Sequence, residues 1–165
     1  MSKRARQYMG LIAAVVSYYV VHEGAHLLYA LAMGVFKEIR FMGLGMQIDI
    51  YAEQLTDTQL GVFCLLGAVA TFVVGYLLVL GSRWICGRKS KVLRAMLYYV
   101  TITMLILDPI YLGVLCSFFG GGDMNGISLL IPELAARVAF LILLAVNALV
   151  FWKIVLPRYT KSFQE

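Results

Sequence analysis

Two histidines and a glutamate at the spacing H-E-x-x-H are the residues of this sequence best suited to chemistry. His22, Glu23 and His26 lie in an otherwise apolar run, residues 8–33, and the chain has no other histidine. Four residues of spacing on an α-helix place both imidazoles on one face, where they can share a metal ion. Glu23 lies about 100° round the same turn, beside the metal's open position, where it could accept a proton from water. We therefore predict a Zn²⁺ site with His22 and His26 as ligands and Glu23 as the catalytic base.

The composition places these residues in a membrane. Of the 165 residues, 62% are apolar and 14% are charged, and the mean hydropathy of +0.86 is too high for an ordinary soluble domain. Ionisable residues in a membrane segment are costly and usually functional, which favours a metal site over a helix whose polar residues are only satisfied by neighbours. The three cysteines are scattered singly, so neither a disulfide framework nor a thiolate zinc site is indicated.

Four apolar runs, at residues 8–33, 60–80, 95–119 and 134–156, each reach the roughly 20 residues that a spanning helix needs. The first is also longer than the apolar part of a signal peptide. We predict a single all-α integral membrane domain over residues 1–165. The tail, residues 157–165, is short and polar, and we expect it to be mobile.

The loop at residues 34–59 has the pattern of a β-hairpin. Glycines separate two short segments, and residues 46–51 alternate apolar and polar side chains with period two. One interpretation is an ordinary surface hairpin. The other is an exposed strand edge that pairs with an extended segment of a substrate protein.

The positive charge of the chain follows its membrane topology. With the N-terminus in the cytosol, eleven of the fourteen Lys and Arg residues fall on the inner side, and the outer side has only Lys37, Arg40 and Arg137. This bias predicts that both termini are cytosolic and that the metal site lies in the outer half of the bilayer. Because the basic residues flank apolar runs, they do not indicate a nucleic-acid partner.

The third span offers two candidates for a third metal ligand, which a catalytic zinc usually needs. Asp108 lies at a depth similar to that of His22. Asp123 lies past the end of a straight helix, although a kink at Pro109 and the glycines at 120–122 could let the chain fold back toward a cavity. Alternatively, Asp108 orients a ligand histidine or bonds the backbone freed by Pro109, and Asp123 is an exposed turn residue.

Two further polar features are expected to pack helices together. Gly67, Thr71 and Gly75 recur every four residues in the second span and would let another helix approach closely, which could shape the site. Asn147 is the only polar residue in the middle of the fourth span, and such a residue more often bridges helices than contacts substrate.

Taken together, these features resemble the site-2 protease-like family of intramembrane zinc metalloproteases. The resemblance covers roughly residues 8–126, as a minimal four-span member: H-E-x-x-H in the first span, a β-like segment, a small-residue second span and a Gly-Asp-x-x-Gly element after the third. It implies zinc bound by both histidines and an aspartate near a broken helix, with the glutamate as general base.

The chain departs from the family pattern at the third ligand and in sidedness. The family motif has Asn and Pro upstream of an Asp-Gly pair, whereas here Asp108 and Pro109 stand upstream, and Asp123 is not followed by glycine. By its position in the motif we take Asp123 as the third ligand, with Asp108 as the alternative. Family members typically open toward the cytosol, whereas the charge bias here points the histidines outward.

The predicted function is an intramembrane zinc endopeptidase that hydrolyses peptide bonds within or next to the membrane span of a protein substrate. The hairpin at residues 34–51 would clamp the substrate strand, and no individual substrate-binding residue is indicated. The alternative is a non-catalytic membrane module that holds a structural metal or recruits a partner protein. A transporter is less favoured because the chain has no internal repeat.

Overall fold

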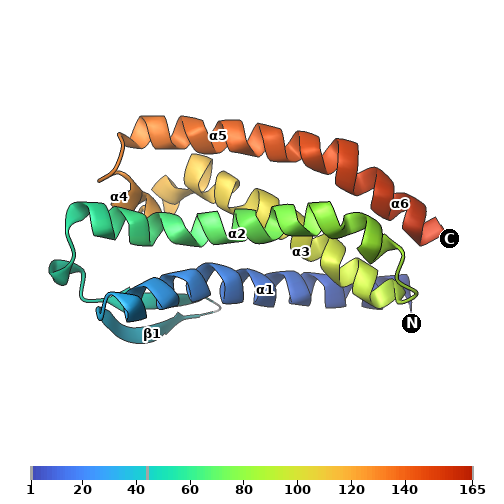
Figure 1. Ribbon diagram of the computed structural model, residues 1–165, viewed down its shortest axis with the longest axis horizontal. Helices are drawn as coiled ribbons and strands as arrows, with labels where there is room; N and C mark the ends of the chain where they lie inside the picture. Colours follow the sequence, from blue (N-terminus) through green and yellow to red (C-terminus); the bar gives the residue numbers. More distant parts are fainter. Residues whose placement is uncertain (1, 44, 165) are drawn as a thin grey trace.

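The computed structural model describes residues 2–43 and 45–164, which form a bundle of long helices with a small hairpin at one end (Figure 1). Within these residues, four helical segments are long and apolar enough to cross a membrane: α1 (Lys3–Ala32), α2 (Asp57–Cys86), α3 with its continuation (Lys91–Phe119), and α5 with α6 (Glu133–Gln164). The four predicted helices of spanning length are therefore confirmed, and they are consistent with a multi-pass membrane protein.

Polar caps start three of these helices before the apolar runs begin. The side chains of Ser2 and Ser90 cap α1 and α3, and Thr56 and Gln59 form a reciprocal capping box at the start of α2. Caps satisfy the first backbone N–H groups, which have no partner within the helix. The helices therefore extend beyond the apolar runs, because an apolar run marks only the part of a helix that suits the hydrocarbon layer.

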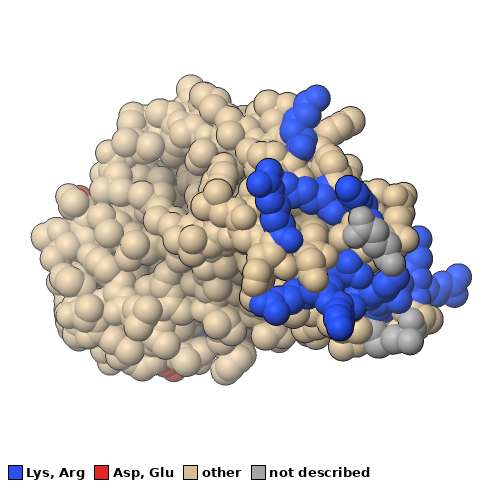
Figure 2. All heavy atoms as spheres, turned by 45° about the vertical axis from the view of Figure 1, so that its right-hand side comes forward, with Lys and Arg blue, Asp and Glu red and all other residues tan. Residues whose placement is uncertain are grey.

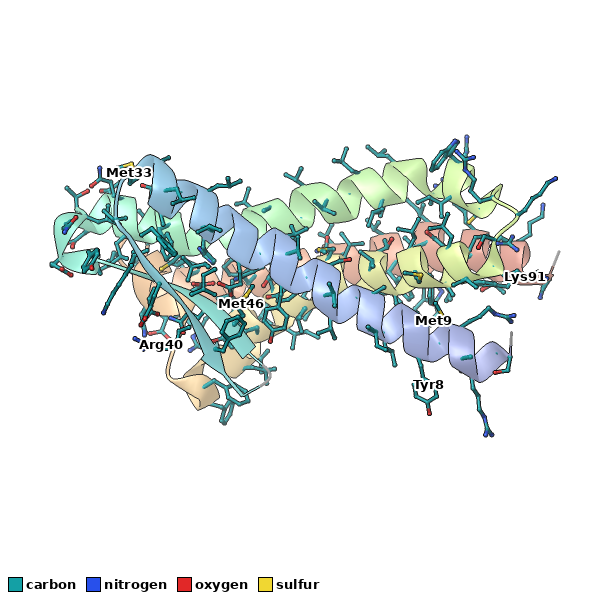
Figure 3. The ribbon with its side chains drawn as sticks, turned by 90° about the horizontal axis from the view of Figure 1, so that it is seen from below. Tyr8, Met9, Met33, Arg40, Met46 and Lys91 are labelled. Atoms are coloured by element: carbon teal, nitrogen blue, oxygen red, sulfur yellow. The ribbon has the colours of Figure 1, made fainter. Side chains whose placement is uncertain are left out.

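The predicted hairpin is present between α1 and α2. Strands β1 (Phe36–Met42) and β2 (Gly45–Ile50) pair antiparallel, and the short 3₁₀ turn η1 (Ala52–Gln54) leads into α2. A cross-strand ion pair joins Arg40 to Asp49. In Figure 3 the hairpin lies along the C-terminal half of α1, with Arg40 and Met46 at the opposite end of the molecule from Tyr8 and Lys91. Strand β2 thus lies beside the part of α1 that carries the histidines.

The third span changes its helical geometry just after Pro109. Helix α3 (Lys91–Ile110) continues as a π-helical turn, η2 (Tyr111–Leu115), and a 3₁₀ turn, η3 (Cys116–Phe119). Pro109 has no N–H, so the carbonyl of Leu105 loses its usual helical partner. The Asn147 amide donates to that carbonyl at 2.6 Å, and its oxygen accepts a bond from the Tyr76 hydroxyl at 2.6 Å. Asn147 therefore bridges three helices, as predicted.

Three consecutive glycines then reverse the chain. Gly120, Gly121 and Gly122 have φ angles of +78°, +89° and +50°, in a region that glycine adopts far more readily than other residues. The Asn125 side chain donates to the Gly120 carbonyl at 3.1 Å and closes the turn. The short helix α4 (Asp123–Ile127) follows and packs against α2, so the segment folds back toward the bundle.

The expectation of a mobile tail was wrong. Helix α5 (Glu133–Val150) continues through the π-helical turn η4 (Phe151–Val155) into α6 (Leu156–Gln164). Tyr159 and Ser162 of α6 are buried, and the buried guanidinium of Arg94 donates to the Ser162 carbonyl at 2.5 Å. These contacts fix the C-terminal segment to the bundle, although its polar composition is typical of a mobile chain end. Both chain ends lie at the same end of the bundle (Figure 1), whereas their assignment to the cytosol stays a prediction.

Candidate metal centre

The side chains of His22, His26 and Asp123 converge in the structure, and one ligand atom of each lies within 4.8 Å of the others. Helix α1 places the two imidazoles one turn apart, with 3.2 Å between their Nε2 atoms. The Oδ2 atom of Asp123 lies 3.1 Å from Nε2 of His22 and 3.5 Å from Nε2 of His26. Ligand atoms roughly 2.0–2.1 Å from a tetrahedral zinc ion are about 3.3 Å apart. The three atoms therefore have the spacing expected of three ligand atoms around one tetrahedral zinc ion.

The electrostatics of this cluster also suit a cation. Burial opposes ionisation of Asp123, but hydrogen bonding to His22 and His26 outweighs it and lowers the pKa of the carboxyl to about 2. A carboxylate oxygen and two imidazole nitrogens that face one another present lone pairs to the same point, which is unfavourable unless a proton or a metal ion lies between them. Ionised carboxylate and imidazole are both zinc ligands.

Helix α2 leaves room for the cluster at Gly67. A Cβ atom at this position would lie 2.6 Å from Nε2 of both His22 and His26, which is closer than van der Waals contact permits. One turn earlier, the Phe63 ring packs against the His26 ring at 4.6 Å between centroids. The absence of a side chain at Gly67 thus makes space at the converging nitrogens. The small-residue stripe of α2 therefore shapes the site as well as packing helices.

Asp108 approaches the same histidine from the other side. Its Oδ1 lies 3.3 Å from Nδ1 of His22, an ion-pair distance without the alignment of a hydrogen bond. The Tyr18 hydroxyl donates to Oδ1 at 2.5 Å, and the Thr71 hydroxyl donates to Oδ2. Asp108 is fully buried and does not line the neighbouring cavity. It is thus placed to orient His22 rather than to reach the converging Nε2 atoms.

Glu23 lies next to this cluster and is held by the hairpin. Its Oε2 accepts a hydrogen bond from the backbone N–H of Ile48 in β2, at 3.1 Å. A cavity of about 860 Å³ adjoins the site and is lined by residues of α1, β2, α2, the third span and the glycine turn. Glu23, both histidines and Asp123 all face it. A molecule in this cavity can therefore meet the candidate ligands and the candidate base together.

Tyr18 and the Ile48 amide take part in the site but were not predicted from the sequence, and neither was the contact of Gly67 with the histidines. Tyr18 lies four residues before His22 on the same helical face, and its ring stacks on that of His22 at 5.1 Å between centroids. That spacing was a usable signal for Tyr18. The sequence indicated Gly67 as a packing residue that could shape the site, but not its contact with the two histidines, and a backbone amide has no signature in side-chain types.

The fold and the site together define a mostly helical protein with four candidate membrane spans and a His-His-Asp cluster beside a cavity. No family model, curated protein or solved structure matches the chain.

Proposed function

We propose that this protein is an intramembrane zinc endopeptidase that cleaves a membrane-embedded or juxtamembrane segment of another protein. The observation that carries the proposal is the spacing of 3.1–3.5 Å among the ligand atoms of His22, His26 and Asp123. Three ligand atoms at this spacing would occupy three positions of a tetrahedral zinc ion. The fourth position would stay open, as it does in catalytic zinc sites. The position of the cluster on the wall of a cavity supports access to that open position.

Each residue of the site then has a role. His22, His26 and Asp123 would hold the ion, and a bound zinc supplies Lewis-acid chemistry that polarises a carbonyl and makes water a stronger acid. Glu23 accepts the proton of the attacking water on its carboxylate and returns it to the leaving amine. The hydrogen bond from the Ile48 amide restrains the Glu23 carboxylate at the cavity wall.

The free edge of strand β2 could hold an extended substrate segment. Residues 45–50 line the cavity, and β1 is the only strand that pairs with β2 among the described residues. The Ile48 N–H donates to Glu23 and not to β1. The edge of β2 that does not pair with β1 therefore faces the candidate base. A protease must extend its substrate, because a helix hides its peptide bonds. Pairing of an extended segment with the β2 edge would present a peptide bond beside Glu23.

A non-catalytic module with a structural zinc is the rival proposal. A structural site is normally closed by a fourth protein ligand. Among the described residues the cluster has three members, and it adjoins a cavity. These two features favour the enzyme.

The test pairs zinc analysis with cleavage for wild type, Glu23→Gln and the surface control Glu53→Gln. Each purified protein, in detergent, is analysed for zinc by mass spectrometry. It is then incubated with a panel of tagged single-span segments, whose products are identified by intact mass. We expect wild type and Glu53→Gln to cleave and Glu23→Gln to be inactive, with one zinc per chain in all three. A reduction of about 10²–10⁴-fold is typical for loss of a general base.

Two results would contradict the proposal in different ways. Cleavage by Glu23→Gln at the wild-type rate would remove Glu23 from the mechanism. Absence of stoichiometric zinc in wild type, after reconstitution with Zn²⁺, would remove the metal centre and leave a recruitment module as the better description.

A further inference from the structure

The end of the bundle opposite the metal cluster carries most of the positive charge. Figure 2 shows Lys and Arg side chains gathered there. They come from the start of α1, the end of α2 with the loop that follows it, the start of α3, and the η4–α6 segment: Lys3, Arg4, Arg6, Arg83, Arg88, Lys89, Lys91, Arg94, Lys153, Arg158 and Lys161. Such a surface attracts anions, but this charge alone does not define a site.

A cavity of about 580 Å³ lies within this basic end, between the first turns of α1, the start of α3 and the last turns of α6. Lys3, Arg6 and Gln7 line it from one face of α1, and Thr160 and Gln164 line it from one face of α6, because residues three and four apart share a helix face. The remaining lining residues are Ala95, Tyr98, Tyr99, Tyr159 and Phe163. None of these ten residues is acidic.

We propose that this cavity binds the phosphate diester of an anionic phospholipid headgroup. Lys and Arg side chains are the usual phosphate donors, and basic pockets between spanning helices recognise anionic headgroups. Thr160 and Gln164 add uncharged hydrogen-bonding groups for the headgroup's hydroxyls. Four of the five other lining residues are aromatic, and aromatic side chains suit the level of the headgroups.

The position of the cavity favours a lipid over a soluble phosphate, although both carry the same anionic oxygens. The cavity lies at the end of the candidate spans, which is where headgroups reside. Further along α1, Leu11 lies one helical turn beyond Gln7 on the same face and is 50% exposed. Its apolar side chain can contact an acyl chain that enters the bilayer from the cavity.

The experiment compares two double variants that remove the same charge from the same end. Lys3→Gln with Arg6→Gln removes both cations of the cavity. Arg4→Gln with Lys161→Gln is the matched control, because neither residue lines the cavity. Purified full-length proteins are delipidated in detergent and titrated with dioleoylphosphatidylglycerol or dioleoylphosphatidylcholine. Bound lipid is counted by native mass spectrometry, and inorganic phosphate is added as a competitor.

We expect wild type and the control to retain one phosphatidylglycerol in preference to phosphatidylcholine, and the Lys3 and Arg6 variant to bind it at least about tenfold more weakly. Equal weakening in both double variants would overturn the proposal in favour of diffuse attraction to the basic end. Displacement of the lipid by equimolar inorganic phosphate would identify a soluble anion as the ligand. Equal retention of both lipids by all proteins would show that the cavity does not select an anionic headgroup.

Discussion

Helix α3 and the short helix α4 each deliver one aspartate to the same imidazole. Asp108 comes from the regular helix α3, and Asp123 is the first residue of α4, directly after the irregular segment of π turn, 3₁₀ turn and glycines. The two residues are fifteen positions apart, which is about 22 Å along a straight helix. Yet Asp108 lies 3.3 Å from Nδ1 of His22, and Asp123 lies 3.1 Å from its Nε2. The chain must therefore turn back within this interval.

The difference between the two carboxylates lies in their surroundings. Asp108 is fully enclosed, with the Tyr18 and Thr71 hydroxyls as donors. The Asp123 side chain is 21% exposed and faces the cavity. A metal ligand must reach the open side of the site, whereas an orienting group works best where it cannot move. The position of Asp108 in α3 thus suits the orienting role, and the position of Asp123 at the start of α4 suits ligation.

Substitution of Asp123 should have the largest effect on zinc binding. Asp123→Ala removes one of three proposed ligands, so the zinc affinity should fall by more than the roughly 10- to 100-fold typical for an outer partner. Affinity is measured by competition with a chromophoric chelator, with Asp57→Ala, an exposed acid at the start of α2, as the control. Wild-type affinity in Asp123→Ala would exclude Asp123 as a ligand and return the choice to Asp108.

Substitution of Asp108 should weaken zinc binding less. Asp108→Asn keeps the size of the side chain but removes the negative charge near Nδ1 of His22, and a loss of about 10- to 100-fold is expected. The electronic spectrum of the Co²⁺-substituted protein should remain tetrahedral, because the three proposed ligands are retained. Loss of the tetrahedral spectrum would instead indicate that Asp108 itself binds the ion.

The contacts of Asn147 near the junction of α3 with the π turn that follows it should affect stability and not zinc affinity. Asn147→Leu leaves the Leu105 carbonyl and the Tyr76 hydroxyl without the partners they have in the structure. Polar contacts between membrane helices contribute about 0.6 kcal/mol each, so the loss should be roughly 1 kcal/mol. Tyr76→Phe removes only one of the two bonds and should have about half the effect in thermal unfolding. A fall in zinc affinity in Asn147→Leu would show that the junction positions Asp123.

Much of this arrangement could be predicted from residue types and local spacing. The H-E-x-x-H spacing places His22 and His26 on one face of α1 whatever the rest of the chain does, because the period of a helix is local. Apolar run length likewise indicated four spans, and glycine separators indicated the hairpin. The packed tail was missed because its composition is polar and its burial depends on Arg94 of another helix.

The sequence by itself indicated the spans, the histidine pair and the candidate base, since each depends on one continuous stretch of chain: about 20 residues for a span, and about two helical turns for the histidines and the glutamate. It also supplied two aspartates, and only the resemblance to the family motif favoured Asp123 over Asp108. Only the tertiary structure assigned one carboxylate to each side of His22, because that assignment depends on how far the chain reverses at Gly120–Gly122 and on the space at Gly67 of another helix. Contacts between residues far apart in the chain cannot be read from a local period.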